Sequence, residues 1–260
     1  MNRRTFLTAS GATTALLSLG GRSASAQAAA VRQYLELQKY TFASAEQKAA
    51  FSAFLKEVAL PAYNRLGLRP VGVFHEDKEG SPLFVLLPHP TAESALTLNH
   101  RLLADATFTT QGAAILEAPK PTPPYAEIES WLLLAFKGMP SVETPVNNPG
   151  RVFQLRIYES PSLKTGQKKI EMFNDAGEIR IFREAGLTPV FFGEALFGAK
   201  MPNLTYMLGF ESEEALKAAW GRFVKHPDWK KISALPEYAD GKILRGITNL
   251  PLRPTDYSQI

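Results

Sequence analysis

The sequence contains no cysteine. This absence excludes a disulfide, a thiolate metal site, a cysteine nucleophile and a lipid anchor attached through cysteine. The chain has 260 residues, 45% of them apolar, and must therefore be held together by packing alone. Its length and composition are ordinary for a globular protein with one or two packed cores.

The sequence also has little net charge beyond its first residues. The formal charge is +4, but three of the 29 basic side chains are Arg3, Arg4 and Arg22, and residues 1–26 contain no acidic side chain. The rest of the chain thus has 26 basic against 25 acidic side chains, without a run of Lys and Arg that would follow a phosphate backbone. We therefore expect no nucleic-acid partner.

Common signatures of metal and cofactor sites are missing as well. No two histidines stand two, three or four residues apart, and no HExxH motif occurs. There is no glycine-rich phosphate loop, no dinucleotide fingerprint and no G-x-S-x-G elbow. We therefore expect no metal and no cofactor. A haem held by a single histidine has no support from any other feature of the sequence. The histidines are His75, His89, His100 and His226.

The N-terminus has the pattern of a twin-arginine signal peptide. Arg3 and Arg4 precede Phe6 and Leu7, a mildly apolar stretch runs to Gly20, and residues 24–26 supply small side chains for cleavage before residue 27. The apolar stretch is too short and too rich in Gly, Ser and Thr to span a bilayer. We expect residues 1–26 to be removed and the protein to be exported to the periplasm or beyond, without a stable membrane anchor.

After the signal peptide the chain aligns with itself at an offset of 118–121 residues. The recurring blocks keep the same order and nearly the same spacing, so the sequence contains one unit written twice. The blocks are Tyr34–Tyr40 over Val152–Tyr158, Gly67–Val71 over Gly186–Val190, Leu83–Leu87 over Leu204–Leu208, and Ala104–Phe108 over Lys225–Trp229.

Each unit has the pattern β-α-β-β-α-β, which is that of a ferredoxin-like unit. We expect strands at 34–42, 70–76, 83–88 and 128–136, and again at 152–159, 189–197, 204–210 and 243–249. Second helices begin at Thr91 and Ser212. Such a unit leaves one apolar sheet face bare, so two units should pack face to face. The predicted fold is α+β, with tandem ferredoxin-like repeats forming an intramolecular dimeric α/β barrel.

The predicted boundaries are a signal peptide at 1–26, a first repeat at 31–137, a linker at 138–150 and a second repeat at 151–257. A proline-rich insertion at 119–124 forms either a lid or an ordinary surface loop. Because both halves of the barrel lie on one chain, we expect a monomer that is a pseudo-dimer, with a homo-oligomer as the alternative.

Two segments of the second half resemble the NIPSNAP family of the dimeric α/β barrel superfamily. They are Phe153–Tyr158 and the stretch from Trp220 through His226-Pro227-Asp228-Trp229, which the first half replaces with Ala104–Phe108. We therefore expect any active half to be the second. The resemblance implies no single reaction, because family members lack an assigned one, eukaryotic relatives act in interaction and signalling, and neighbouring branches include monooxygenases, isomerases and haem-binding enzymes.

Three functions therefore stay open. The first is the binding of a small apolar or aromatic molecule in the barrel clefts, and the second is a non-enzymatic interaction or structural role. The third is a monooxygenase or isomerase that needs no cofactor.

The first strand of each unit carries a row of polar side chains on one face. These candidate ligand-binding residues are Glu36, Gln38, Tyr40, Gln154, Arg156 and Tyr158. The opposite row is apolar, so we expect it to meet the helices while the polar rows look into the barrel or its mouth. The alternative is an internal hydrogen-bonded network that closes the barrel, formed by Glu36, Gln154, Arg156 and Glu194.

Three residues are candidate catalytic groups. His75 aligns with Glu194, and either side chain can act as a general base in a partly apolar cleft. His226 can act as an acid or base oriented by Asp228. Its structural alternative is the end of a helix, where Pro227 stops the helix and the neighbouring aromatic side chains anchor it to the sheet.

Overall fold

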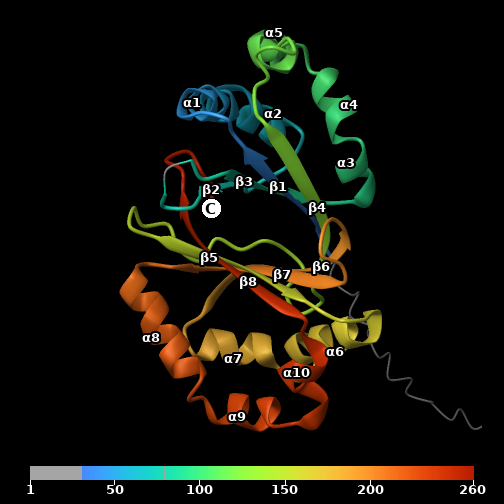
Figure 1. Cartoon of the computed structure of the whole chain (residues 1–260), viewed down its shortest axis with the longest axis vertical. Coiled ribbons are helices and arrows are strands. Elements are labelled where there is room, and N and C mark those ends of the chain that lie inside the picture. Colours follow the sequence, from blue (N-terminus) through green and yellow to red (C-terminus); the bar gives the residue numbers. More distant parts are fainter. Residues whose placement is uncertain (1–30, 79) are drawn as a thin grey trace, which may run out of the picture.

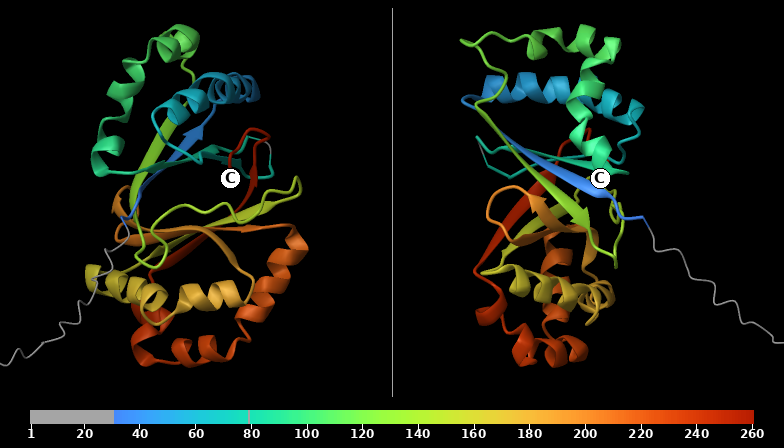
Figure 2. Two further views of the ribbon diagram at one scale, coloured as in Figure 1. Left: turned by 180° about the vertical axis from the view of Figure 1, so that it is seen from behind. Right: turned by 90° about the vertical axis from the view of Figure 1, so that its right-hand side faces the viewer.

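The computed structural model describes residues 31–78 and 80–260, and the predicted signal peptide lies outside the described residues. Within that part of the chain, no helix is both long and apolar enough to cross a membrane. The two halves stack one above the other, each with its helices on the outside (Figures 1 and 2).

The first half begins with strand β1 and a long helix. Its elements are β1 (Tyr34–Thr41), α1 (Ala45–Phe54), the π-helical turn η1 (Leu55–Ala59), α2 (Leu60–Arg65), β2 (Gly72–His75), β3 (Leu83–His89), α3 (Ala92–Leu96), α4 (Leu98–Leu103), α5 (Ala106–Leu116) and β4 (Glu127–Ala135). The helix predicted to begin at Thr91 does begin there, since the Thr91 hydroxyl accepts from the Ser94 N–H, but it is broken into three segments.

The second half repeats this order with extra short helices. Its elements are β5 (Val152–Glu159), α6 (Leu163–Asn174), α7 (Glu178–Glu184), β6 (Thr188–Phe197), β7 (Asn203–Phe210), α8 (Glu213–Phe223), α9 (Pro227–Ser233), the 3-10 turn η2 (Pro236–Tyr238), α10 (Asp240–Ile243) and β8 (Gly246–Pro254). The last strand starts later than the predicted 243–249, because α10 occupies the residues before it.

The eight strands form a closed antiparallel barrel in the order β1-β3-β2-β8-β5-β7-β6-β4. Within each half the first strand lies between the last and the third, as in a ferredoxin-like unit. The halves join along both edges, where β2 pairs with β8 and β4 pairs with β6. The predicted fold class is confirmed, and each strand has two neighbours, so the barrel leaves no free edge.

The barrel interior is a core shared by both halves. It holds the apolar row of each first strand, represented by Leu35 and Leu37 from β1 and by Phe153 and Leu155 from β5, all of which are buried. The prediction that these rows meet the helices is therefore wrong. Two sheets that face each other need a common apolar filling, and this requirement decides which row turns inward.

The polar rows consequently lie between the sheets and the helices. Tyr40 belongs to the core between the first sheet and its helices, and Tyr158 belongs to the corresponding core of the second half. Each polar row thus lies on an outer face of the barrel, and the helices of its own half cover that face (Figure 1).

Candidate functional site

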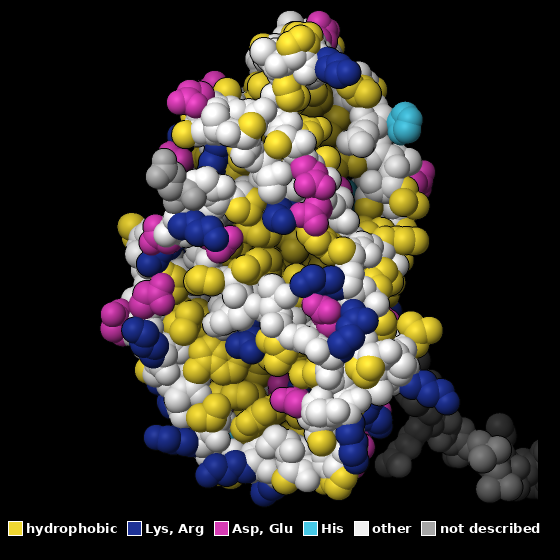
Figure 3. Space-filling view, viewed as in Figure 1, with side chains coloured by type: hydrophobic (Ala, Val, Ile, Leu, Met, Phe, Trp, Pro, Cys, Tyr) yellow, Lys and Arg dark blue, Asp and Glu magenta, His cyan; other side chains and the backbone are white. Residues whose placement is uncertain are grey.

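The first half encloses a cleft between its sheet and its helices, which we call the tyrosine cleft. Its volume is about 530 Å³. The polar row of β1 forms the floor, and α1, η1, α2, α4 and α5 supply the walls. The lining side chains include Glu36, Gln38, Tyr40, Phe51, Phe54, Tyr63, Leu98, Asn99, Phe108, Ile115, Tyr125 and Ser130. On the face drawn in Figure 3, apolar side chains line a hollow below α5.

Aromatic rings make one wall of the tyrosine cleft. The ring of Tyr40 lies 4.5 Å from that of Phe51 and 5.2 Å from that of Tyr125, which meets it edge-on. Tyr125 follows the proline-rich insertion, and the amide of Gln47 on α1 donates to the Pro123 carbonyl. The insertion is therefore fastened to the helix beside the cleft.

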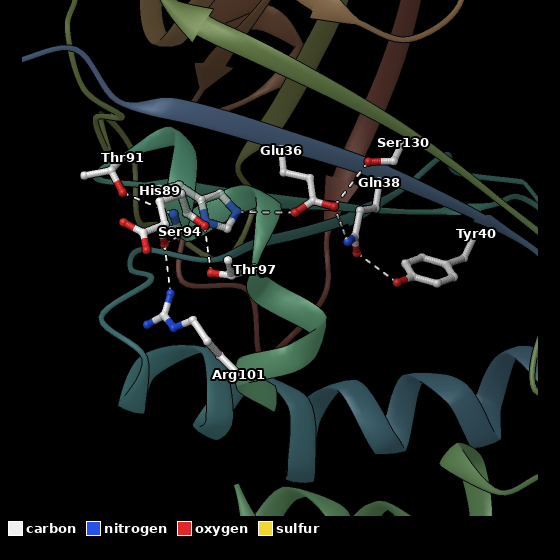
Figure 4. Close-up of polar contacts among 10 residues, drawn as sticks. Glu36, Gln38, Tyr40, His89, Thr91, Ser94, Thr97, Arg101 and Ser130 are labelled. Carbon is white, nitrogen blue, oxygen red and sulfur yellow. Dashed lines mark hydrogen bonds and ion pairs between the residues drawn. The ribbon is translucent and has the colours of Figure 1, made fainter. Parts of the chain in front are cut away.

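Glu36 is the polar centre of the floor (Figure 4). Its Oε1 accepts from the Gln38 amide at 2.7 Å and from the Ser130 hydroxyl at 3.2 Å, and its Oε2 lies 3.3 Å from His89 Nε2. The Tyr40 hydroxyl donates to Gln38 Oε1 at 2.8 Å. The carboxylate and its neighbours are thus held in fixed positions. The network predicted from sequence is wrong, because Glu36 bonds within the first half, whereas Gln154 and Glu194 bond to Trp220 and Gln167 in the second.

His89 contacts the Glu36 carboxylate and is fully buried at the end of β3. Its Nδ1 lies 3.1 Å from the Ser94 hydroxyl, and that oxygen also accepts from Arg101 at 3.0 Å (Figure 4). A neutral imidazole that donates from Nε2 to Glu36 and accepts from Ser94 satisfies every one of these contacts.

Two tyrosine hydroxyls in the cleft are available to a ligand. Among the described residues, neither Tyr63 nor Tyr125 has a hydrogen-bond partner for its hydroxyl, and both line the cleft. Burial raises the pKa of Tyr63, and the nearby Glu36 carboxylate raises it further. Burial likewise raises the pKa of Tyr40 well above its usual value. The phenols of Tyr63 and Tyr40 therefore stay protonated and act as hydrogen-bond donors.

The equivalent space in the second half is filled by large side chains. Tyr206 and Phe192 are fully buried there, at the repeat positions that Val85 and Val73 occupy in the first half. The ring of Tyr206 stacks on that of Phe192 at 5.2 Å. Two valines exchanged for two aromatic residues thus explain why the described 530 Å³ cleft lies in the first half, whereas we expected the active half to be the second.

The polar row of β5 lies in this filled region, and its side chains make different contacts from those of the β1 row. The side-chain oxygen Oε1 of Gln154 accepts from the Trp220 indole at 2.9 Å, and Tyr206 donates to Tyr158 at 3.0 Å. Arg156 places its guanidinium 4.8 Å from the centre of the Trp220 ring.

A buried ion pair lies close to Arg156. Lys169 and Glu178 are 3.4 Å apart and only 2% and 3% exposed. Burial raises the pKa of the Glu178 carboxyl, although Lys169 and Arg156 act in the opposite direction.

The structure places the three candidate catalytic residues apart from the tyrosine cleft. His75 lies opposite Leu83 and its Nδ1 contacts the Glu76 carbonyl, while Glu194 lies opposite Leu204 and accepts from Gln167. These positions are equivalent by register, as the repeat predicts, but each belongs to its own half.

His226 begins helix α9 at the surface. Its Nδ1 accepts from the Asp228 N–H at 3.2 Å, so His226 itself is the cap residue. The Trp229 ring packs 4.4 Å from that of Phe223, as the structural alternative predicted.

A smaller cavity of about 280 Å³ lies at one end of the barrel, between the halves. Leu37, Trp131 and Leu155 line it, and the ion pair of Lys39 with Glu129 stands at its rim. Figure 3 shows this apolar patch near the middle of the face, with charged side chains around it. The barrel mouth is thus apolar where polar rows were expected.

Several residues of the site were not predicted from the sequence. Tyr63 lies on α2, His89 on β3 and Tyr125 in the loop before β4, and Lys169 and Glu178 lie on two helices of the second half. No spacing rule links them, because the tertiary fold alone brings them together. Among the described residues, no group of three or more His, Cys, Asp or Glu side chains is placed to hold a metal ion.

This geometry defines the chain as two ferredoxin-like units fused into one α/β barrel, with an open cleft in the first unit. Within that class, residues 153–259 match the model of the NIPSNAP family, so the second half is similar to that family. No curated protein matches the sequence.

Solved structures share the barrel fold across both halves. A candidate monooxygenase from Lactobacillus acidophilus is 13% identical, with a TM-score of 0.56 over 86% of this chain and 94% of its own. A candidate monooxygenase from Fusobacterium nucleatum is 8% identical, with a TM-score of 0.55 over 86% and 93%. An uncharacterized NIPSNAP-like domain protein from Burkholderia xenovorans is 16% identical, with a TM-score of 0.37 over 43% and 90%. At such identities the two longer matches show the fold alone.

Proposed function

We propose that the protein binds a small, uncharged aromatic molecule in the tyrosine cleft. The observation that carries the proposal is a cleft of about 530 Å³ whose walls are aromatic and whose floor holds a fixed carboxylate. Ligand pockets commonly have a few hundred cubic ångströms or more, with an apolar lining and few polar groups. A purely structural barrel does not require such a space, so the cleft favours the binding of a small molecule over an interaction or structural role.

The polar groups of the cleft specify the ligand further. The Tyr63 and Tyr125 hydroxyls are free to donate to a carbonyl or hydroxyl oxygen, and Glu36 is placed to accept from a ligand hydroxyl. The negative charge of Glu36 disfavours an anion. A hydroxylated aromatic compound without a charged group satisfies both conditions.

The test uses 1-naphthol as the probe, with titration calorimetry on the purified protein. We expect saturable binding that Tyr63→Phe weakens about fivefold, since one neutral hydrogen bond contributes about 1 kcal/mol. Leu98→Trp, which adds a large side chain to the wall, should abolish binding. Tyr158→Phe removes a hydroxyl from the second half and is the matched control. No saturable binding, or equal binding by all three variants, would contradict the proposal.

A second candidate function is oxidation or isomerisation of the bound molecule without a cofactor. It is supported by the description of the two longer structural matches as candidate monooxygenases and by a carboxylate facing the cleft. Glu36 is placed to take a proton from a ligand hydroxyl, which is how a general base begins such reactions. Oxygen uptake with bound 1-naphthol, absent in Glu36→Gln, is the observation that separates catalysis from binding alone.

We also propose that the protein is exported by the twin-arginine pathway and acts outside the cytoplasm as a monomer. The paired Arg3 and Arg4 support export, and the barrel closed on itself supports a monomer, because both sheet edges are already paired within the chain. Replacing both arginines with lysine should leave the uncleaved protein inside the cell. Light scattering of the purified protein measures its mass and should give that of a monomer.

A further inference from the structure

The filled region of the second half holds more positive than negative charge. Lys169 and Glu178 form a buried ion pair, which leaves the guanidinium of Arg156 as the excess charge. Among the described residues, Arg156 has no ion-pair or hydrogen-bond partner, and its Nε is buried without an acceptor. A guanidinium has five N–H donors, and burying one without a partner is costly.

Aromatic rings hold this guanidinium without satisfying its donors. Its central carbon lies 4.8 Å from the Trp220 ring centre, 5.3 Å from that of Tyr158 and 6.0 Å from that of Tyr206. Such contacts replace part of the lost hydration through the ring faces. The N–H groups lie in the guanidinium plane, however, and need oxygen acceptors.

The neighbouring acceptors are already engaged. The side-chain oxygen Oε1 of Gln154 accepts from the Trp220 indole, the Tyr158 hydroxyl accepts from Tyr206, and Glu178 accepts from Lys169. Arg156 is itself only partly buried, so a molecule from solvent can reach its outer nitrogens.

We propose that Arg156 is the anchor of a second binding site, which takes a small monocarboxylate. One uncompensated positive charge matches one carboxylate, and the planar fork of the guanidinium pairs with both of its oxygens. The ligand would meet the partly exposed side of the guanidinium from solvent, with its apolar part beside the Trp220 ring, which lies 4.8 Å from the guanidinium carbon.

The two halves therefore select different ligands. Gln38 stands at the repeat position of Arg156 and is bonded to Glu36, so the first cleft is anionic where the second is cationic. The carboxylate site depends on none of the residues of the tyrosine cleft, and the two proposals stand or fall separately.

Benzoate is the probe, titrated into the full-length protein at low ionic strength and followed by calorimetry and tryptophan emission. We expect saturable binding that Arg156→Gln, which copies the first half, weakens at least tenfold, because a charged hydrogen bond contributes about 1.5–3 kcal/mol. Arg156→Lys keeps the charge without the fork and should bind several-fold more weakly than the parent. The emission change should disappear in Trp220→Phe.

Arg180→Gln is the matched control, because Arg180 is an exposed arginine already paired with Glu184 and Asp228. It should bind benzoate like the parent. Circular dichroism of each variant separates loss of the site from loss of the fold, and Arg156→Lys serves if Arg156→Gln does not fold. The proposal is overturned if the parent shows no saturable binding, or if a folded Arg156 variant binds benzoate as tightly as the parent.

Discussion

At the residue scale, the second half depends on a charge pair that most cores avoid. Lys169 is buried among rings, with its ammonium 5.0 Å from the centre of Phe173 and 5.5 Å from that of Tyr158. The cost of removing both ions from water is offset only while the pair is intact. Loss of one partner leaves the other as an isolated buried charge.

Lys169→Met should therefore destabilise the protein by about 3–5 kcal/mol at pH 8. Burial already raises the pKa of Glu178 above its usual 4.5, and loss of Lys169 raises it further. The folded variant then binds a proton more tightly than the unfolded chain does, so its stability falls as pH rises above the unfolded pKa. Urea unfolding at pH 5 and pH 8 measures the difference.

The matched control is Lys169→Met combined with Glu178→Leu, which removes both charges and should recover much of the loss at pH 8. A Lys169→Met variant that is equally destabilised at both pH values would show that Glu178 does not titrate in this range.

At the element scale, the two halves use different residues for the same turn. Asp105 caps α5 through the Thr107 and Phe108 N–H groups, and His226, at the same repeat position, caps α9. The His-Pro-Asp-Trp segment therefore has a structural role that the first half fulfils with a carboxylate. A histidine that caps a helix on the surface does not need a reaction to explain it.

His226→Asn should accordingly keep the stability of the parent within about 0.5 kcal/mol, since Asn is among the preferred cap residues and adds no negative charge beside Glu184, which lies 3.3 Å from His226 Nε2. His226→Ala should lose about 1 kcal/mol. Thermal and urea unfolding measure both changes, and titration with 1-naphthol and benzoate accompanies them. If His226→Asn folds like the parent but loses binding or turnover, His226 has a chemical role beyond the cap.

At the scale of the whole molecule, the fold follows from the sequence because it depends on patterns that repeat. Period-two strands, glycines after helices and the offset of about 120 residues together predict two ferredoxin-like units and a barrel. The predicted orientation of the first strands was wrong. An alternation of period two separates two rows of side chains but does not say which row faces the barrel interior. Which row faces the barrel interior depends on whether the interior or the space under the helices excludes water more completely.

The candidate sites were predicted less completely for a similar reason. The row on β1 was identified, but its buried partner His89 and the free hydroxyls of Tyr63 and Tyr125 come from distant segments. The open space depends on Val85 and Val73 where the second half has Tyr206 and Phe192. Such a volume difference is visible in the sequence only after the fold shows which positions face the helices.

The shared barrel core makes a last prediction about how the molecule unfolds. Leu155 of β5 is fully buried in a core to which Leu37, Leu86 and Leu133 of the first half also belong. Leu155→Ala should cost about 2–5 kcal/mol. Because the core belongs to both halves and two pairs of edge strands join them, both halves should lose stability together.

Two reporter proteins test this coupling. One keeps Trp131 of the first half, with Trp220 and Trp229 changed to Phe, and the other keeps Trp220 alone. With Leu155→Ala present, the urea midpoints of both reporters should fall by the same amount. Ile157→Ala, at the partly exposed mouth of the barrel, is the matched control and should cost less. If Leu155→Ala left the urea midpoint of the Trp131 reporter unchanged, the two halves would fold as separate units. A core that belongs to both halves cannot weaken only one of them.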